Sequence, residues 1–142
     1  ILGNGQSRQQ FDLEPLRGKG TTYGCNAVYR DFEPDYLVSL DRNISQEIAE
    51  NYDIENKPCY SININQKRYS EHFILVPRNP TMNTGATATH IARFDGHSKI
   101  YLLGFDSYNT EPTKINNVYV GTNAYAKEEE VYEYDLWTHQ MV

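Results

Sequence analysis

The sequence predicts an α/β fold of the Rossmann-like, three-layer type with a mainly parallel sheet. Short apolar segments alternate with segments of helical pattern, as expected for parallel strands joined by helical crossovers. Residues 73–76 form a continuous apolar run, which is typical of a strand covered on both faces. Glycine-containing turns follow several apolar segments, and such sheets hold phosphorylated ligands at the ends of their strands. We therefore expect one sheet with a ligand-binding edge.

The first half of the chain is expected to contain a short strand at its start, three further strands and one helix. Residues 21–25 and 36–40 are rich in Tyr, Thr, Val and Leu, and both are predicted strands. A helix is expected over 44–52, with Asn43 as its N-cap. Residues 58–62 follow as the next strand, which places a helix between two strands as a parallel crossover requires.

The second half is expected to continue the same pattern. After the strand at 73–76, small residues near the start of 84–94 and the glycine at position 96 predict a helix with a defined end. Residues 100–103 are the next predicted strand. The Asn- and Tyr-rich stretch 107–126 is expected to be a long loop over the edge of the sheet. The acidic segment 127–137 is interpreted as a solvated helix face or end segment.

Composition limits the function classes. The 142 residues are 39% hydrophobic and are predicted to form a single domain over 1–142. A net charge of −6 disfavours broad nucleic-acid binding. The longest apolar runs are far shorter than the roughly 20 residues of a membrane span, so a cytoplasmic protein without membrane contact is expected. Cys25 and Cys59 are predicted to be buried free thiols. Twelve tyrosines leave a homo-oligomer open, and we expect further residues before Ile1 because its strand is so short.

The first candidate ligand site is the turn that begins at Gly3. Glycines at positions 3 and 5 let backbone N–H groups approach an anion that a Cβ would keep away. Asn4 adds an amide, and Arg8 adds a forked donor suited to phosphate. A plain tight turn is the alternative interpretation. The turn matches neither the dinucleotide fingerprint nor the P-loop, which excludes the ordinary NAD and ATP sites of those types.

The second set of candidates comes from later strand and helix ends. Thr84 and Gly85 open the predicted helix, so they could bind an anion, although a simple N-cap explains Thr84 equally well. Asp41 and Asp106 each end a strand, where a carboxylate could bind a ribose hydroxyl, a base or Mg²⁺, or cap a local turn. His90 could act as a base only if its helix face turned inward. The histidines lack zinc-ligand spacing, and no metal site is predicted.

Taken in order, these motifs resemble two related groups of nucleotide-using proteins. One is the bacterial sialyltransferases of glycosyltransferase family 42, and the other is the archaeal-type 6-hydroxymethylpterin diphosphokinase-like domains. The resemblance covers about residues 1–110 as spaced motifs. It is carried by Gly3-Asn4-Gly5-Gln6-Ser7, Cys25-Asn26, Pro34-Asp35-Tyr36 with Asp41, Thr84-Gly85, and Ile100-Tyr101-Leu102-Leu103-Gly104-Phe105-Asp106-Ser107-Tyr108.

The resemblance to the sialyltransferases implies a site for the cytidine monophosphate part of a donor. The residues that it implicates are Gly3, Asn4, Gly5, Ser7, Asn26, Thr84, Gly85 and Tyr108, with Tyr119 as a looser match. This chain departs from that pattern because Gln6 replaces proline and Thr84 replaces serine, and no residue matches the catalytic histidine of those enzymes. The resemblance to the pterin group places Asp41 and Asp106 near a Mg²⁺-nucleotide. The whole chain also looks like small bacteriophage proteins of no known activity.

Our leading hypothesis is a nucleotide or nucleotide-sugar binding protein, in the form of a glycosyltransferase-like enzyme that acts by direct displacement. In it Asn4, Asn26, Thr84 and Tyr108 hold the nucleotide, Arg8 meets phosphate, and a carboxylate or His90 is the base. The first alternative is a non-catalytic phage protein that sequesters a host nucleotide signal or docks on a host protein. The second is a Mg²⁺-dependent pterin diphosphokinase-like enzyme.

Overall fold

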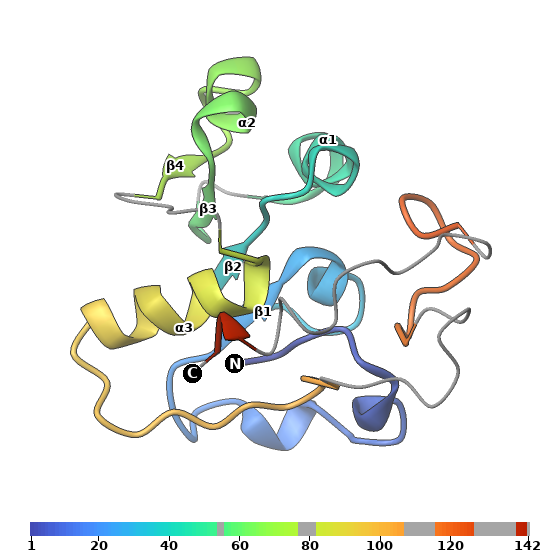
Figure 1. The fold of residues 1–142 in the computed structure, drawn as a ribbon, viewed down its shortest axis with the longest axis vertical. Coiled ribbons are helices and arrows are strands. Elements are labelled where there is room, and N and C mark those ends of the chain that lie inside the picture. The colour runs from blue at the N-terminus through green and yellow to red at the C-terminus, as the bar shows by residue number, and fades with distance from the viewer. Residues whose placement is uncertain (54–55, 77–81, 107–115, 127–138, 142) are drawn as a thin grey trace.

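The computed structural model describes residues 1–53, 56–76, 82–106, 116–126 and 139–141 (Figure 1). Its four strands form one sheet in the order β1-β2-β3-β4, with every neighbouring pair parallel. The prediction of an α/β fold with a mainly parallel sheet is therefore confirmed. In chain order the elements are the short 3-10 helices η1 (Gln6–Arg8) and η2 (Glu14–Leu16), then β1 (Tyr23–Cys25), η3 (Asn26–Arg30), β2 (Tyr36–Val38), α1 (Arg42–Asn51), β3 (Cys59–Ser61), α2 (Asn63–Arg68), β4 (Ile74–Leu75) and α3 (Thr84–Phe94).

Single parallel bridges extend the sheet beyond β1. Leu2 bridges to Gly24 on one side and to Leu103 on the other. The chain therefore steps outward from Leu2 to β4, and α3 then carries it back to Leu103 on the opposite side of Leu2. This reversal creates a topological switch point, where open α/β sheets bind ligands beside the carboxyl ends of their strands. The strands predicted at 1–2 and 100–103 are single bridge positions.

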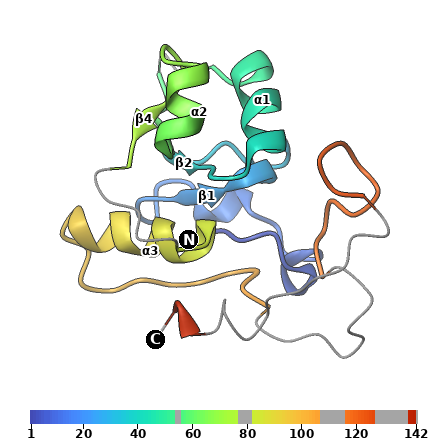
Figure 2. The same ribbon diagram turned by 45° about the horizontal axis from the view of Figure 1, so that its top comes forward.

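Helices cover both faces of the sheet, which makes three layers (Figure 2). Successive residues of β2 point to opposite faces, as in any strand. Leu37 packs in one core cluster with Ile44 and Ile48 of α1. Val38 packs in a second cluster with Ile91 and the small alanines of α3. The core is thus divided by the sheet, with α1 and α2 on one side and α3 on the other.

Helix α3 has the limits that the sequence predicts. The Asn83 side chain accepts a hydrogen bond from the Ala86 amide (2.8 Å), which satisfies one of the unpaired N–H groups at the helix start. Ala88 and Ala92 are buried against the sheet, where small side chains allow a close approach. Gly96 follows the helix with φ of 90°, a backbone conformation that favours glycine and ends the helix.

Helix α1 begins two residues earlier than predicted. Its N-cap residue is Asp41, and Asn43 lies inside the helix. Ile44 and Ile48 are four residues apart and share the buried face, as the sequence pattern indicates. The sequence pattern does not predict α2, because a six-residue helix of mostly polar side chains has no apolar periodicity.

The prediction that residues 73–76 form a strand covered on both faces is wrong. The strand β4 has only two residues, and Ile74 and Leu75 are each 48% exposed. Within the described residues β4 pairs only with β3, so it lies at the end of the sheet order. An edge position explains why apolar strand residues remain in contact with solvent.

The predicted loop, the acidic segment and the two cysteines can be compared with the structure only where it describes them. Residues 107–115 of the predicted loop and the acidic segment 127–137 lie outside the described residues, whereas 116–126 forms successive turns. Cys25 and Cys59 are free and buried, as predicted. Burial raises the pKa of the Cys25 thiol to about 12, so it is protonated at neutral pH. No helix among the described residues has the length and apolar character needed to cross a bilayer.

Candidate functional site

Three of the predicted ligand residues follow neighbouring strand positions at the same edge of the sheet. Asn4 lies two residues after Leu2, and Asn26 directly follows β1. Asp41 lies between β2 and α1. Because the strands are parallel, all three residues come to the carboxyl edge, beside the topological switch point.

Asn26 has the least common backbone conformation of these residues. Its φ of 50° lies in the left-handed region, which Asn tolerates better than most residues but which still disfavours L-amino acids. Its side chain is 9% exposed and makes two directed contacts. Asn26 Nδ2 donates to Asp41 Oδ2 (2.7 Å), and Asn26 Oδ1 accepts from Thr84 Oγ1 (3.4 Å). These contacts fix both ends of a buried amide at a strained backbone position.

Thr84 comes to this site because a different residue caps α3. Asn83 is the N-cap, so Thr84 occupies the first helical position. Its hydroxyl turns toward Asn26, and the side chain is buried. The alternative interpretation of Thr84 as a simple N-cap is therefore wrong. The neighbouring Gly85 serves packing, because a Cβ there would lie 2.6 Å from the Phe105 ring.

Tyr125 is a further residue of this site that the sequence analysis missed. Asn4 Nδ2 donates to its hydroxyl (3.3 Å), and the Ala27 backbone amide also donates to it. Burial and then the nearby Asp41 carboxylate raise the pKa of Tyr125, so its hydroxyl is neutral at physiological pH. Asn4 Oδ1 is buried and has no hydrogen-bond partner among the described residues. We call these five residues the Asn26 cluster: Asn4, Asn26, Asp41, Thr84 and Tyr125.

The glycine turn, residues 3–8, makes its hydrogen bonds within the chain. The Gly3 amide donates to the Leu103 carbonyl (2.8 Å), and the Gly5 amide donates to the Gly104 carbonyl (2.9 Å). The Asp106 carboxylate accepts from the Ser7 amide (2.9 Å) and from the Ser7 hydroxyl. A carboxylate of the chain thus occupies the position beside Ser7 where the sequence analysis expects a ligand anion.

Arg8 and Tyr119 also bind each other and the glycine turn. Arg8 is 4% exposed, and its Nε donates to the Gly3 carbonyl (2.7 Å). Its Nη2 donates to the Tyr119 hydroxyl (2.6 Å) and contacts Asp31 (3.2 Å). The Tyr119 hydroxyl in turn donates to Asp31 Oδ2 (2.7 Å). The forked donor predicted for phosphate is therefore bound to the chain's own oxygens.

No family model, curated protein or solved structure matches this chain. The geometry of the Asn26 cluster and the glycine turn is therefore the basis for assigning a function. The two groups lie side by side at the carboxyl edge, because Asn4 belongs to the first and is also part of the turn that forms the second. Asn4, which the two groups share, has a buried side-chain oxygen with no partner in the described part of the chain.

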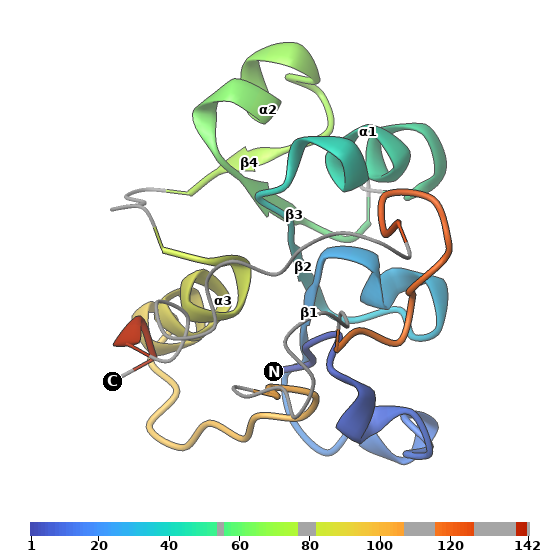
Figure 3. The same cartoon turned by 45° about the vertical axis from the view of Figure 1, so that its right-hand side comes forward.

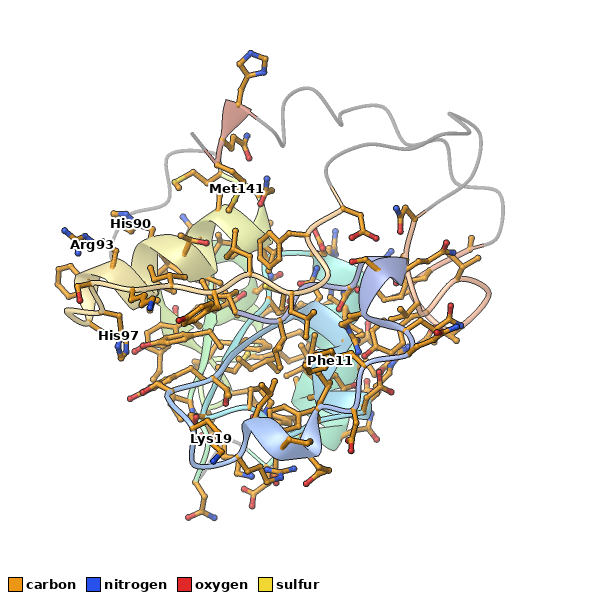
Figure 4. The ribbon with its side chains drawn as sticks, turned by 90° about the horizontal axis from the view of Figure 1, so that it is seen from below. Phe11, Lys19, His90, Arg93, His97 and Met141 are labelled. Carbon is orange, nitrogen blue, oxygen red and sulfur yellow. The ribbon has the colours of Figure 1, made fainter. Side chains whose placement is uncertain are left out.

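The remaining candidates lie apart from the Asn26 cluster or outside the described residues. His90 is exposed on α3, where it and Arg93 point away from the sheet (Figure 4). It follows Thr84 by six residues, or about 9 Å along the helix axis. Asp41 and Asp106 hold different partners, and no group of three metal-ligating residues occurs in the described parts of the chain. Tyr108 lies outside the described residues.

Proposed function

We propose that this protein binds a nucleotide or nucleotide sugar at the Asn26 cluster. The observation that carries the proposal is Asn26 itself: a buried, left-handed residue held between Asp41 and Thr84 at the carboxyl edge. Conformations of this kind cost free energy and concentrate at functional sites. The amide and carboxylate groups offer both donors and acceptors, which suits the hydroxyls of a ribose and the polar edge of a base.

Two further observations support a ligand at this position. Asn4 Oδ1 is buried without a described partner, and buried polar atoms are normally hydrogen-bonded, so a ligand donor would satisfy it. In addition, the residues that resemble the nucleotide contacts of the family 42 sialyltransferases include Asn4, Asn26 and Thr84. Cytidine nucleotides and their sugar conjugates are therefore the first ligands to test.

Binding is the primary function in this proposal, and glycosyl transfer is its catalytic extension. His90 is remote from the Asn26 cluster, so Asp41 is the candidate general base of a direct displacement. Turnover separates the enzyme from a phage protein that sequesters a host nucleotide in the cytoplasm. Tight binding with the ligand recovered unchanged would favour sequestration.

The test is a calorimetric and thermal-shift screen with cytidine, uridine, guanosine and adenosine monophosphates and CMP-sugars. A ligand at 100 times its Kd should stabilise the wild-type protein by about 2.7 kcal/mol. Asn26→Gly should lose this binding and keep its fold, because glycine adopts the left-handed conformation without strain. His90→Ala is the matched control and should bind like the wild type.

The screen also separates the competing functions. No stabilisation by any nucleotide would overturn the proposal, and unchanged binding by Asn26→Gly would place the ligand elsewhere. Binding that requires Mg²⁺ and disappears in both Asp41→Asn and Asp106→Asn would instead support the diphosphokinase-like alternative, because only that function needs both carboxylates around a metal.

A further inference from the structure

The segment 116–126 lies across the carboxyl edge next to the proposed nucleotide site. Its first residues attach to the glycine turn: Asn116 Oδ1 accepts from the Gln6 amide, and the Val118 amide donates to the Asn4 carbonyl, both at 2.8 Å. Figure 3 shows the segment, coloured orange-red, beside α1 and the start of the chain's blue portion. The segment therefore contacts residues that precede it by more than 100 positions.

Two groups of polar contacts hold the segment in this place. Near its start, Tyr119 is bound to Arg8 and Asp31. Farther along, the Thr122 hydroxyl and Asn123 contact the ion pair of Arg30 and Glu47 that joins η3 to α1. Arg30 Nη1 donates to Thr122 Oγ1 (2.8 Å), and Asn123 Nδ2 donates to Glu47 Oε2 (2.8 Å). These contacts position Tyr125, which follows two residues later.

The Tyr125 hydroxyl uses hydrogen bonds that the proposed site would offer to a ligand. Two donors converge on its oxygen, one from the Asn4 side chain and one from the Ala27 backbone. Ala27 directly follows the left-handed Asn26, so the backbone conformation of Asn26 also sets the direction of the Ala27 amide, which donates to the Tyr125 hydroxyl. A ligand oxygen seated in the Asn26 cluster would need these donors.

We propose that Tyr125 closes the Asn26 cluster and that a nucleotide must displace its hydroxyl to bind. This inference rests on the proposed function and adds a competitor for the same site within the chain. The measured affinity is then the intrinsic affinity reduced by the fraction of molecules in which Tyr125 has moved away. The 116–126 segment and the nucleotide exclude one another at Asn4 and Ala27.

The test compares nucleotide affinity in the wild type, Tyr125→Phe and Tyr125→Ala. Loss of the hydroxyl removes the acceptor of both hydrogen bonds from the closed state, so Tyr125→Phe should bind nucleotide at least about fivefold more tightly. Tyr125→Ala should bind at least as tightly as Tyr125→Phe. Tyr101→Phe is the matched control, since Tyr101 is 71% exposed and lies outside the segment, and its affinity should equal that of the wild type.

Hydrogen exchange provides a second measurement that needs no substitution. The Val118 amide donates to Asn4 and the Gly121 amide donates to the Tyr125 carbonyl, so both report on the docked segment. Added nucleotide should accelerate exchange at both amides. Slower exchange would mean that the segment closes on the ligand, and it would overturn the proposal.

The outcomes distinguish this inference from the proposed function. If the wild type binds nucleotide and Tyr125→Phe binds it equally well or more weakly, displacement of Tyr125 is ruled out and the proposed nucleotide binding stands. Binding by Tyr125→Phe alone would support closure of the site by Tyr125, and it would overturn nucleotide binding as a function of the wild-type protein. Absence of binding in every variant would remove both.

Discussion

The glycine turn and the Asn26 cluster lie side by side at one edge of the sheet, yet they are closed in different ways. Backbone atoms close the glycine turn, because Gly3 and Gly5 donate to the carbonyls of Leu103 and Gly104. Side chains close the Asn26 cluster, where Tyr125 bonds to Asn4. The hydrogen bonds that close the glycine turn are part of the backbone pairing of the sheet. The Asn26 cluster is closed by a few side-chain hydrogen bonds, which a ligand could replace.

The difference shows how glycines after a strand can be interpreted in two ways. Glycine allows a close approach, and the sequence alone does not tell what approaches. At position 3 the approaching group is the backbone of Gly104, and at position 5 it is the Asp106 carboxylate. In this protein the glycine pattern therefore accounts for chain packing, while the less conspicuous Asn26 occupies the position better suited to a ligand.

The largest predicted effect tests the closure of the glycine turn. In Gly3→Ala the new Cβ would collide with the backbone carbonyl of Gly104, which cannot move without breaking the pairing around Leu2. We expect a loss of about 3 kcal/mol or more in the free energy of unfolding, or failure to fold. Urea denaturation monitored by circular dichroism measures it.

Gly20→Ala is the matched control for this substitution. A Cβ at position 20 has no heavy atom within 4 Å, and the residue does not require the left-handed conformation. The control should therefore change stability by less than about 1 kcal/mol, in the stabilising direction. Equal stability of the two variants would contradict the description of the turn as closed by backbone.

The next largest effect concerns the ion pair of Arg30 and Glu47, which contacts the 116–126 segment beside the Asn26 cluster. Hydrogen bonds from Arg30, with help from Tyr29 and Asn123, lower the pKa of Glu47 to about 2, although partial burial opposes the shift. A depressed carboxyl pKa stabilises the fold above the unfolded-state value of about 4.3, and this contribution is lost as pH falls toward 2. Glu47→Gln should therefore lower stability by about 2–3 kcal/mol at pH 7.

The pH dependence provides the check on this assignment. Stability of the wild type should fall between about pH 4.5 and pH 2 more steeply than stability of Glu47→Gln, because the variant no longer titrates there. The glycine turn should retain slow amide exchange at Gly3 and Gly5 over this range, while exchange at Gly121 accelerates. If the stability of the two proteins depended on pH in the same way, the pKa of Glu47 would not be lowered in the folded protein.

The sequence predicted the parts of the fold that depend on local pattern. Helix α3 has the predicted bounds 84–94 because its small residues and flanking Asn83 and Gly96 are local signals. Burial of β4 was predicted incorrectly, because exposure depends on the order of strands in the sheet. The amino-acid composition of the apolar run 73–76 does not reveal the order of the strands in the sheet.

The residues of the candidate site could likewise be predicted only where a local feature of the sequence marks them. Asp41 and Thr84 could be selected because one follows a strand and the other begins a helix, and Asn26 was implied by the resemblance to the sialyltransferases. The structure joins the three by hydrogen bonds. Tyr125 could not be selected, since its partner Asn4 is 121 residues away and the intervening turns carry no periodic signal. The sequence contains twelve tyrosines and does not indicate which of them reaches this edge of the sheet.

The smallest predicted effect separates the two regions by function. Asp106→Asn removes the charge that Ser7 binds through its amide and hydroxyl, and it should lower stability by about 1–2 kcal/mol. Because Asp106 binds Ser7 of the glycine turn and not the Asn26 cluster, nucleotide affinity should change less than about threefold. Asp41→Asn alters the partner of Asn26, so it should weaken nucleotide binding about tenfold. Calorimetric titration of both variants measures the contrast. A gain of affinity in Asp106→Asn would show that the ligand anion replaces Asp106 beside Ser7. A larger loss of affinity in Asp106→Asn than in Asp41→Asn would instead place the ligand at the glycine turn.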